Sequence, residues 1–234
     1  MKTFEPFALK FSHSKKTFFK TIVTLLSFAL LFCFSACQRK IEYFDYVSEL
    51  RSNIFLAESN ELSLRIYAVA KETPYVTDGI KKEISTLTEI YLTAPSGNRE
   101  YNVSFNVNGR NYGGDMSFDN VKAEYYFSCT LDVSEFSSIE CRIDSGSENT
   151  TLTATSVLTS STLTPKTVLK NLQTAESELF SSLTDKYGFA GEIYIRLIYE
   201  DSPYYYVGVI DRESHIHAFL INAETGKILA RRQS

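Results

Sequence analysis

Residues 101–109 read YNVSFNVNG, in which apolar and polar side chains alternate up to an Asn-Gly pair. Alternation with a period of two is typical of a strand with one buried face. Asn-Gly is the strongest short-range signal for a two-residue turn between antiparallel strands. The stretch therefore predicts a hairpin with Val107 opposite Arg110 and Phe105 opposite Tyr112.

The same alternation appears on both sides of this hairpin. Residues 62–70, LSLRIYAVA, have the pattern of a half-buried strand. A turn centred on Ser59 would pair this strand with the preceding run, with Leu56 opposite Leu62. About eight short strands separated by turn signals are typical of an antiparallel β-sandwich. The sequence therefore predicts a β-sandwich domain over residues 47–160.

The chain changes character at Pro165. Thr164 is a good helix N-cap and Pro165 suits the first helical position. Apolar side chains then recur at helical spacing from Val168 to Leu183. Three strands and a short fourth follow, at residues 193–200, 204–210, 215–221 and 227–230. The sequence predicts a small α+β module over residues 164–234, with one helix on a three- to four-stranded antiparallel sheet.

An apolar run of residues, 21–36, precedes both predicted domains. It reads TIVTLLSFALLFCFSA and follows five lysines; it is shorter than the roughly 20 residues that a membrane-spanning helix needs. Small residues then lead into Cys37, so the segment resembles the lipobox of bacterial lipoproteins. The resemblance implies removal of residues 1–36, attachment of lipid, including palmitate, to the Cys37 thiol, and a tether over residues 37–46. An uncleaved membrane anchor is the alternative.

Such processing would place the protein on the extracytoplasmic side of the cell membrane, held there by its lipid. The remaining chain carries 19 basic and 27 acidic residues, a net charge of −8. Phosphate binding needs a basic surface, so this balance argues against a nucleic-acid partner.

A second hairpin is predicted between Phe127 and Ile143. A turn centred on Glu135 would set Cys129 directly opposite Cys141. Directly opposed residues in an antiparallel pair lie close enough for a disulfide, and disulfides persist outside the cytoplasm. The alternative is two reduced, buried cysteines that act as small hydrophobic residues.

Residues 204–229 read YYYVGVIDRESHIHAFLINAETGKIL. The segment from Asn222 to Leu229 resembles the phrase with which the strands of the PepSY family end. That family more often has Asp at the position of Asn222. The resemblance implies an extracytoplasmic regulatory or protease-inhibiting module without catalysis of its own.

His215 and His217 are the only histidines after Cys37. Zinc sites use three or four ligands, so we predict no metal site, no cofactor and no catalytic residues. The alternative is a metal-dependent or hydrolytic enzyme that uses these two histidines.

With a turn at residues 212–213, five side chains share the sheet face opposite the helix: Tyr204, Tyr206, His215, His217 and Phe219. Aromatic residues on an uncovered sheet commonly mark a contact surface. We therefore expect a membrane-tethered, non-catalytic binding or regulatory module whose partner is an unknown protein or cell-envelope component. The alternative is that this face packs on the β-sandwich.

Overall fold

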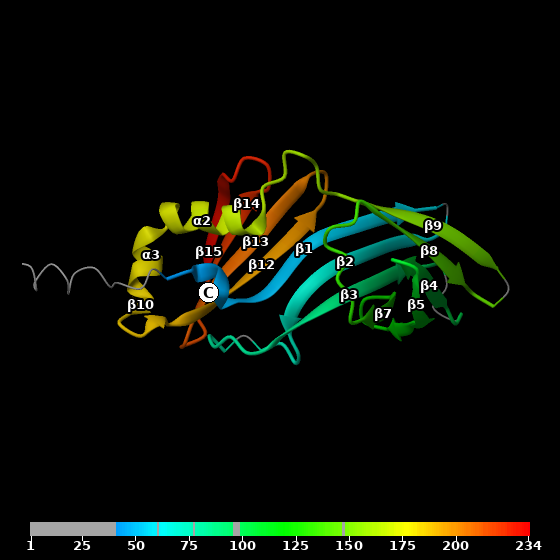
Figure 1. The fold of residues 1–234 in the computed structure, drawn as a ribbon, viewed down its shortest axis with the longest axis horizontal. Coiled ribbons are helices and arrows are strands. Elements are labelled where there is room, and N and C mark those ends of the chain that lie inside the picture. The colour runs from blue at the N-terminus through cyan, green and yellow to red at the C-terminus, as the bar shows by residue number, and fades with distance from the viewer. Residues whose placement is uncertain (1–40, 60, 77, 96–98, 147) are drawn as a thin grey trace, which may run out of the picture. The chain divides into compact units, whose positions relative to one another are not determined.

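Strand β1 (Val47–Glu58) joins two branches of a single sheet in the computed structural model, which describes residues 41–234 except 60, 77, 96–98 and 147. One edge of β1 pairs antiparallel with β2 (Ser63–Glu72). Its other edge is divided between two partners (Figure 1). The first half runs parallel to β12 (Gly191–Tyr199), and the second half pairs antiparallel with β9 (Asn149–Ser156).

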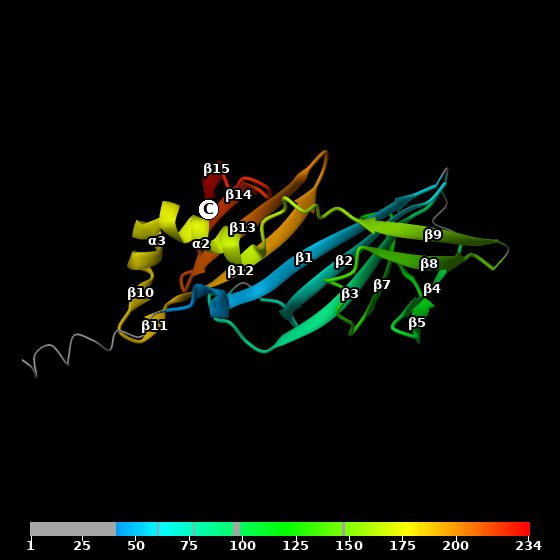
Figure 2. The same cartoon turned by 45° about the horizontal axis from the view of Figure 1, so that its top comes forward.

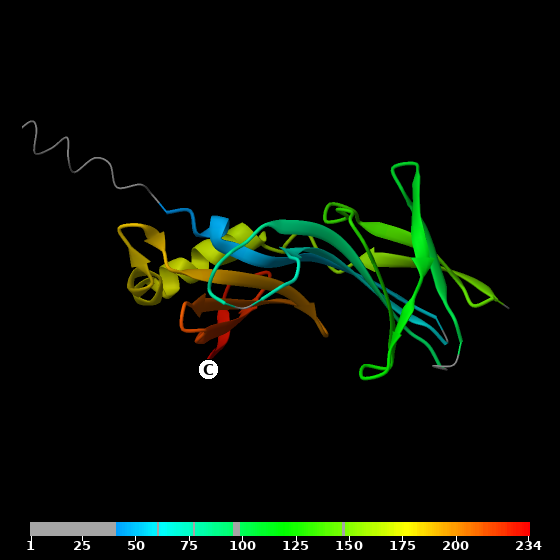
Figure 3. The same ribbon diagram turned by 90° about the horizontal axis from the view of Figure 1, so that it is seen from below.

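The N-terminal branch has two arms that start from β1. The first arm continues from β2 through β3 (Ile84–Thr93) and β7 (Glu124–Cys129) to β6 (Ser117–Asp119). The second continues from β9 through β8 (Ser138–Asp144) and β4 (Asn102–Val107) to β5 (Arg110–Asp115). The arms bend toward each other (Figure 3). A Cβ built on Gly114 of β5 would lie 3.0 Å from the Phe127 ring of β7, so the arms pack closely where they meet.

This curled sheet encloses the main apolar core. Its fully buried members include Phe55, Leu64, Ile66, Ile90, Val103 and Ile143. The prediction of a mainly β fold is confirmed. The predicted sandwich of two separate sheets is not seen, because the strands of residues 47–160 belong to one sheet that closes over its own inner face.

The hairpin signals had different outcomes. The Asn-Gly hairpin is confirmed, with Val107 opposite Arg110 and Phe105 opposite Tyr112. The predicted pairing of Leu56 with Leu62 is wrong, because Leu56 pairs with Arg65. A turn in which the Ser59 N–H donates to the Leu62 carbonyl at 2.8 Å lies between the strands. The shift of three residues is odd, so it exchanges the faces of β1 and turns Phe55 into the core.

The predicted hairpin between Phe127 and Ile143 is also wrong. Strand β7 pairs with β3 and β6, whereas β8 pairs with β4 and β9. Cys129 therefore lies opposite Thr88, and Cys141 lies between Phe105 and Leu152. Both cysteines are free thiols in the structure. The register argument for a Cys129–Cys141 disulfide is thereby removed.

The C-terminal branch is a meander covered by helices (Figure 2). Strand β12 continues into β13 (Pro203–Asp211), β14 (Ile216–Asn222) and β15 (Ile228–Gln233), all antiparallel as predicted. Helix α2 (Pro165–Ala175) starts at the predicted cap, where the Thr167 N–H donates to Thr164 Oγ1 at 3.2 Å. The predicted single helix is interrupted at Glu176 and continues as α3 (Ser177–Ser182). A two-stranded hairpin, β10 (Thr184–Asp185) and β11 (Gly188–Phe189), follows.

The predicted boundary between residues 160 and 164 falls in the connection between the branches. Strand β1 of the first predicted domain nevertheless pairs with β12 of the second. Whether residues 164–234 fold alone stays a prediction. The predicted signal segment and Cys37 lie outside the described residues. None of the described helices is long and apolar enough to cross a membrane.

Candidate functional site: a tyrosine-rich sheet face

The predicted face of tyrosines and histidines is split by a one-residue difference in register. Ile210 pairs with Ile216 rather than His215, because the turn includes Ser214 in the left-handed region at φ 66°. Tyr206 consequently lies opposite Leu220, and Val207 lies opposite Phe219. Successive side chains of a strand point to opposite faces of the sheet. A slip of one residue therefore moves every predicted β14 side chain to the face opposite the one expected.

Helix α2 lies over the face that contains Val207 and Phe219. The neighbouring Tyr205 donates its hydroxyl to the carbonyl of Leu163, just before the helix, at 2.9 Å. Tyr204 and Tyr206 therefore stand on the face away from the helix, and His217 and Phe219 stand on the helix side. The five predicted residues do not form one surface.

His215 belongs to the turn after β13. Its Nδ1 lies 2.9 Å from Asp211 Oδ2, and Asp211 Oδ1 accepts the N–H groups of Glu213 and His215 at 2.9 Å each. Ligand atoms of Asp211, Glu213 and His215 lie within 4.8 Å of one another, in a group that does not include His217. The hydrogen bonds close the turn and account for this arrangement.

The sheet face away from α2 carries a row of tyrosines that we call the tyrosine face: Tyr67, Tyr91, Tyr126, Tyr194 and Tyr206. The rings of Tyr67 and Tyr91 are 5.4 Å apart, and those of Tyr91 and Tyr126 are 5.1 Å apart. On the other branch, the rings of Tyr194 and Tyr206 are 5.7 Å apart. Gly208 lies opposite Tyr194 and makes room for its ring, because a Cβ there would lie 2.0 Å from it.

Two arginines connect the tyrosines of the two branches. Arg51 of β1 and Arg196 of β12 are register partners in the parallel pair. The Arg51 guanidinium lies 4.1 Å from the Tyr67 ring centroid, and that of Arg196 lies 4.5 Å from the Tyr194 centroid. Cation–π contacts of this kind hold both partners in place. The tyrosine face thus runs across β7, β3, β2, β1, β12 and β13.

Three carboxylates on this face are paired with cations. Glu49 lies 2.5 Å from Arg196, Glu89 lies 2.5 Å from Lys71, and Glu124 pairs with Arg65. Among the described residues, Arg51 and Lys122 form no ion pair and instead lie over the rings of Tyr67 and Tyr91. Two cations on this face thus contact tyrosine rings rather than carboxylates.

Two phenols on the tyrosine face, those of Tyr91 and Tyr194, have a raised pKa and are neutral at physiological pH. Burial, followed by the charge of Glu89, raises the pKa of Tyr91 above its ordinary value. Burial also raises the pKa of Tyr194, and the neighbouring Tyr206 adds to this rise. These hydroxyls keep their protons and remain hydrogen-bond donors.

A pocket of about 270 Å³ opens on the tyrosine face at the β6–β7 turn. Its walls include Tyr91, Tyr126 and Phe118, and the charged ends of Lys122 and Glu124 stand beside the rings. Sequence reasoning missed this site, since residues from three strands form it. The alternation of Arg65, Tyr67 and Lys71 on one face of β2 was the available signal.

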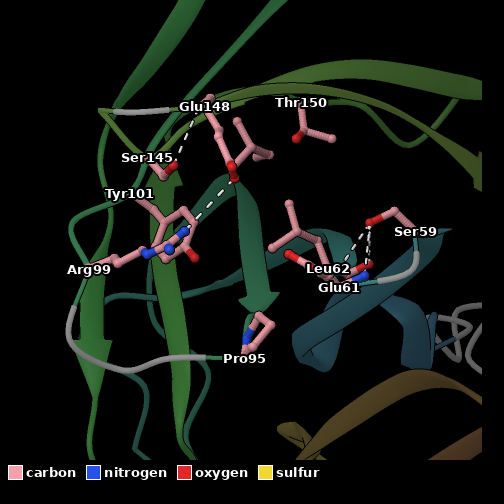
Figure 4. A pocket seen from close by; sticks show the side chains of 10 residues that line it. Ser59, Glu61, Leu62, Pro95, Arg99, Tyr101, Ser145, Glu148 and Thr150 are labelled. Atoms are coloured by element: carbon pink, nitrogen blue, oxygen red, sulfur yellow. Dashed lines mark hydrogen bonds and ion pairs between the residues drawn. The ribbon is translucent and has the colours of Figure 1, made fainter.

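A larger pocket, of about 500 Å³, lies at the far end of the curled sheet (Figure 4). It is formed by the β1–β2 turn, the β3–β4 loop and the β8–β9 turn, and its charged side chains are Glu61, Arg99 and Glu148. Arg99 Nη1 lies 3.9 Å from Glu148 Oε2. The lining mixes acidic, basic and apolar groups and does not single out one ligand chemistry. Comparison of the chain with protein-family models, curated proteins and solved structures finds no match.

Proposed function

We propose that the protein is a lipid-anchored, extracytoplasmic binding module that holds a protein or cell-envelope partner on its tyrosine face and catalyses no reaction. The single observation that carries this proposal is the row of five tyrosines and two arginines across both branches of the sheet. Tyr67, Tyr91, Tyr126 and Tyr206 are half-buried, so each ring keeps a part that a partner can contact.

The chemistry of this face supports a binding role. Tyrosine and arginine are enriched at protein interfaces, where large rigid rings supply contact area at a low entropic cost. Neighbouring rings and ion pairs already hold these side chains, so binding would order few additional rotamers. The PepSY-like phrase at residues 222–229 agrees with a regulatory role without catalysis.

Site-specific crosslinking in intact cells tests the binding surface. A photoreactive benzoylphenylalanine placed at Tyr126 should give a discrete adduct on illumination. Tyr199 is the matched control, because it is a partly exposed tyrosine at the end of β12 and outside the tyrosine face. Equal adducts from both positions, or none from Tyr126, would contradict the proposal.

Anchoring is tested independently of the binding surface. Cys37→Ala should release the protein from membranes or leave an unprocessed precursor. Cys33→Ala is the matched control, since bulky Phe32 precedes that cysteine and excludes it as the attachment point. Wild-type fractionation and a normal mature mass for Cys37→Ala would refute the lipid anchor.

A further inference from the structure

The N-terminal end of the described unit is fixed on the C-terminal branch. The 3₁₀ helix η1 (Tyr43–Tyr46) places the Tyr43 ring 4.9 Å from Phe180 and 5.2 Å from Phe189, with both pairs edge to face. The hydroxyl of Tyr43 lies 3.1 Å from Thr184 Oγ1. Tyr46 Oη accepts the N–H of Phe189 at 3.4 Å. The chain therefore enters the fold directly beside the β10–β11 hairpin.

The tip of this hairpin is held by hydrogen bonds to Asp185 and exposes an aromatic ring. Asp185 Oδ1 accepts the N–H groups of Tyr187 and Gly188 at 2.7 and 3.1 Å, which fixes the turn. Tyr187 is 84% exposed, and the Lys186 ammonium lies 4.9 Å from its ring centroid. The turn thus presents a tyrosine and a lysine together, side chains that are favoured where a membrane meets water.

The length of the tether decides what lies near this tip. Six residue steps separate Cys37 from Tyr43, and at most about 3.6 Å per step gives a reach of roughly 20 Å. A lipid on Cys37 would therefore keep Tyr43, and with it the β10–β11 hairpin, within roughly that distance of the membrane surface. A single exposed tyrosine is ordinary on the surface of a free protein. A membrane held this close would give the Tyr187 ring a surface to contact.

We propose that Lys186 and Tyr187 rest on the lipid surface when the protein is anchored, so that the β10–β11 tip sets its orientation on the membrane. The phenol ring lies at headgroup level with its hydroxyl in water, and the lysine contacts anionic headgroups. This inference rests on the lipid anchor of the proposed function. The tether raises the local concentration of lipid, so contacts that are weak individually become effective.

The absence of tryptophan from the whole chain allows a direct test. Tyr187→Trp introduces a single fluorophore at the tip. Tyr199→Trp is the matched control, because the β10–β11 hairpin directly precedes β12 and Tyr199 lies at the other end of that strand. The mature chain, with a histidine tag in place of Cys37, is bound through nickel-chelating lipid to vesicles of phosphatidylethanolamine and phosphatidylglycerol. The lipids carry bromine near the headgroup end of their acyl chains.

Tyr187→Trp should lose about half of its emission on brominated vesicles relative to unbrominated ones, because its ring would lie at the interface. Tyr199→Trp should keep its emission. Equal quenching of both variants, or quenching of neither, would overturn the proposed orientation. Because the histidine tag replaces acylation, this result is independent of whether Cys37 carries lipid in cells, which fractionation of Cys37→Ala decides.

Discussion

The two branches of the sheet cover their apolar faces in different ways. The N-terminal branch bends until its two arms enclose a common core, so it brings together strands that are far apart in sequence. The C-terminal branch stays open and is covered by α2, which buries Val168, Leu169 and Leu172 and precedes β12 to β15 in the chain. The N-terminal branch covers its apolar face by pairing strands that are distant in sequence. The C-terminal branch uses a helix and strands that are neighbours in sequence, although both branches depend on β1.

The junction between the branches contains a buried amide. Asn53 is 1% exposed and lies where β12 leaves the edge of β1 and β9 begins. Its Nδ2 donates to the carbonyls of Ser134 and Phe136 at 3.0 and 3.3 Å. Its Oδ1 accepts the Ile54 N–H at 2.8 Å and the Ser156 hydroxyl at 2.7 Å. Asn53 thus satisfies polar groups that the divided strand edge would leave buried without partners.

The largest expected effect concerns the independence of the C-terminal branch. Residues 164–234 alone lose β1, which pairs with residues 193–196 along one edge of β12, and lose η1, which packs on Phe180 and Phe189. We expect this fragment to show no cooperative unfolding in a denaturant titration. Residues 42–234 are the matched control and should unfold cooperatively. A cooperative transition in the short fragment would restore the module predicted from sequence.

The next effect tests the junction itself. Asn53→Ala removes four hydrogen bonds and leaves the carbonyls of Ser134 and Phe136 without this donor. The free energy of unfolding should fall by about 2–3 kcal/mol. Asn106→Ala is the control, since Asn106 makes its hydrogen bonds on the exposed side of the Asn-Gly hairpin and should cost less than about 1 kcal/mol. Equal losses would show that the junction is not a special site.

The sequence predicted features that depend on neighbouring residues. The Asn-Gly turn fixed the β4–β5 register, and Thr164 and Pro165 fixed the start of α2. The antiparallel order of β12 to β15 was also predicted, because each of these strands pairs with the next one in the chain. The tyrosine face was predicted only in part, through Tyr206, because its other members come from β2, β3, β7 and β12.

The remaining errors have specific physical causes. Ser214 adopts a left-handed conformation, which no glycine or asparagine signalled, and so lengthens the β13–β14 turn by one residue. The turn between Ser59 and Leu62 sets Leu56 opposite Arg65, and a bulge between Arg51 and Asn53 shifts the register of β1 once more. The β1–β12 pair joins segments that are distant in sequence, and no local pattern specifies such a pairing. Two apolar runs with matching periods, as at residues 127–143, can equally well pair with other strands.

A smaller effect concerns the thiols of the curled core. Burial raises the pKa of Cys141 to about 12 and also raises that of Cys129. The native protein should therefore react slowly with iodoacetamide, and unfolding without reductant should allow both thiols to be alkylated. Mass spectrometry of the labelled protein checks this expectation. A disulfide-linked mass before reduction would contradict the free thiols seen on β7 and β8, which pair with different strands.

The smallest effect concerns Glu192, on β12 where the β2–β3 loop crosses the sheet. The side chain is fully buried; its Oε1 accepts the Ser48 hydroxyl at 3.0 Å, and its Oε2 has no hydrogen-bond partner among the described residues. Burial raises the pKa of Glu192, and the charges of Glu72 and Asp78 raise it further. A carboxyl group with a raised pKa favours the folded state while it is protonated. Its contribution is therefore present below the ordinary glutamate pKa and is lost as the pH rises through the raised value.

Glu192→Gln removes this ionisation and keeps an oxygen for the Ser48 hydroxyl. The variant should have a higher melting temperature than the wild type at neutral pH, and the difference should shrink as the pH falls below the raised pKa, where the wild-type carboxyl is already neutral. Melting curves at several pH values measure this convergence. Glu140→Gln, at an exposed position on β8, is the control and should show no such trend. A difference for Glu192→Gln that stays constant with pH would mean that packing of the amide, rather than loss of the charge, causes the change.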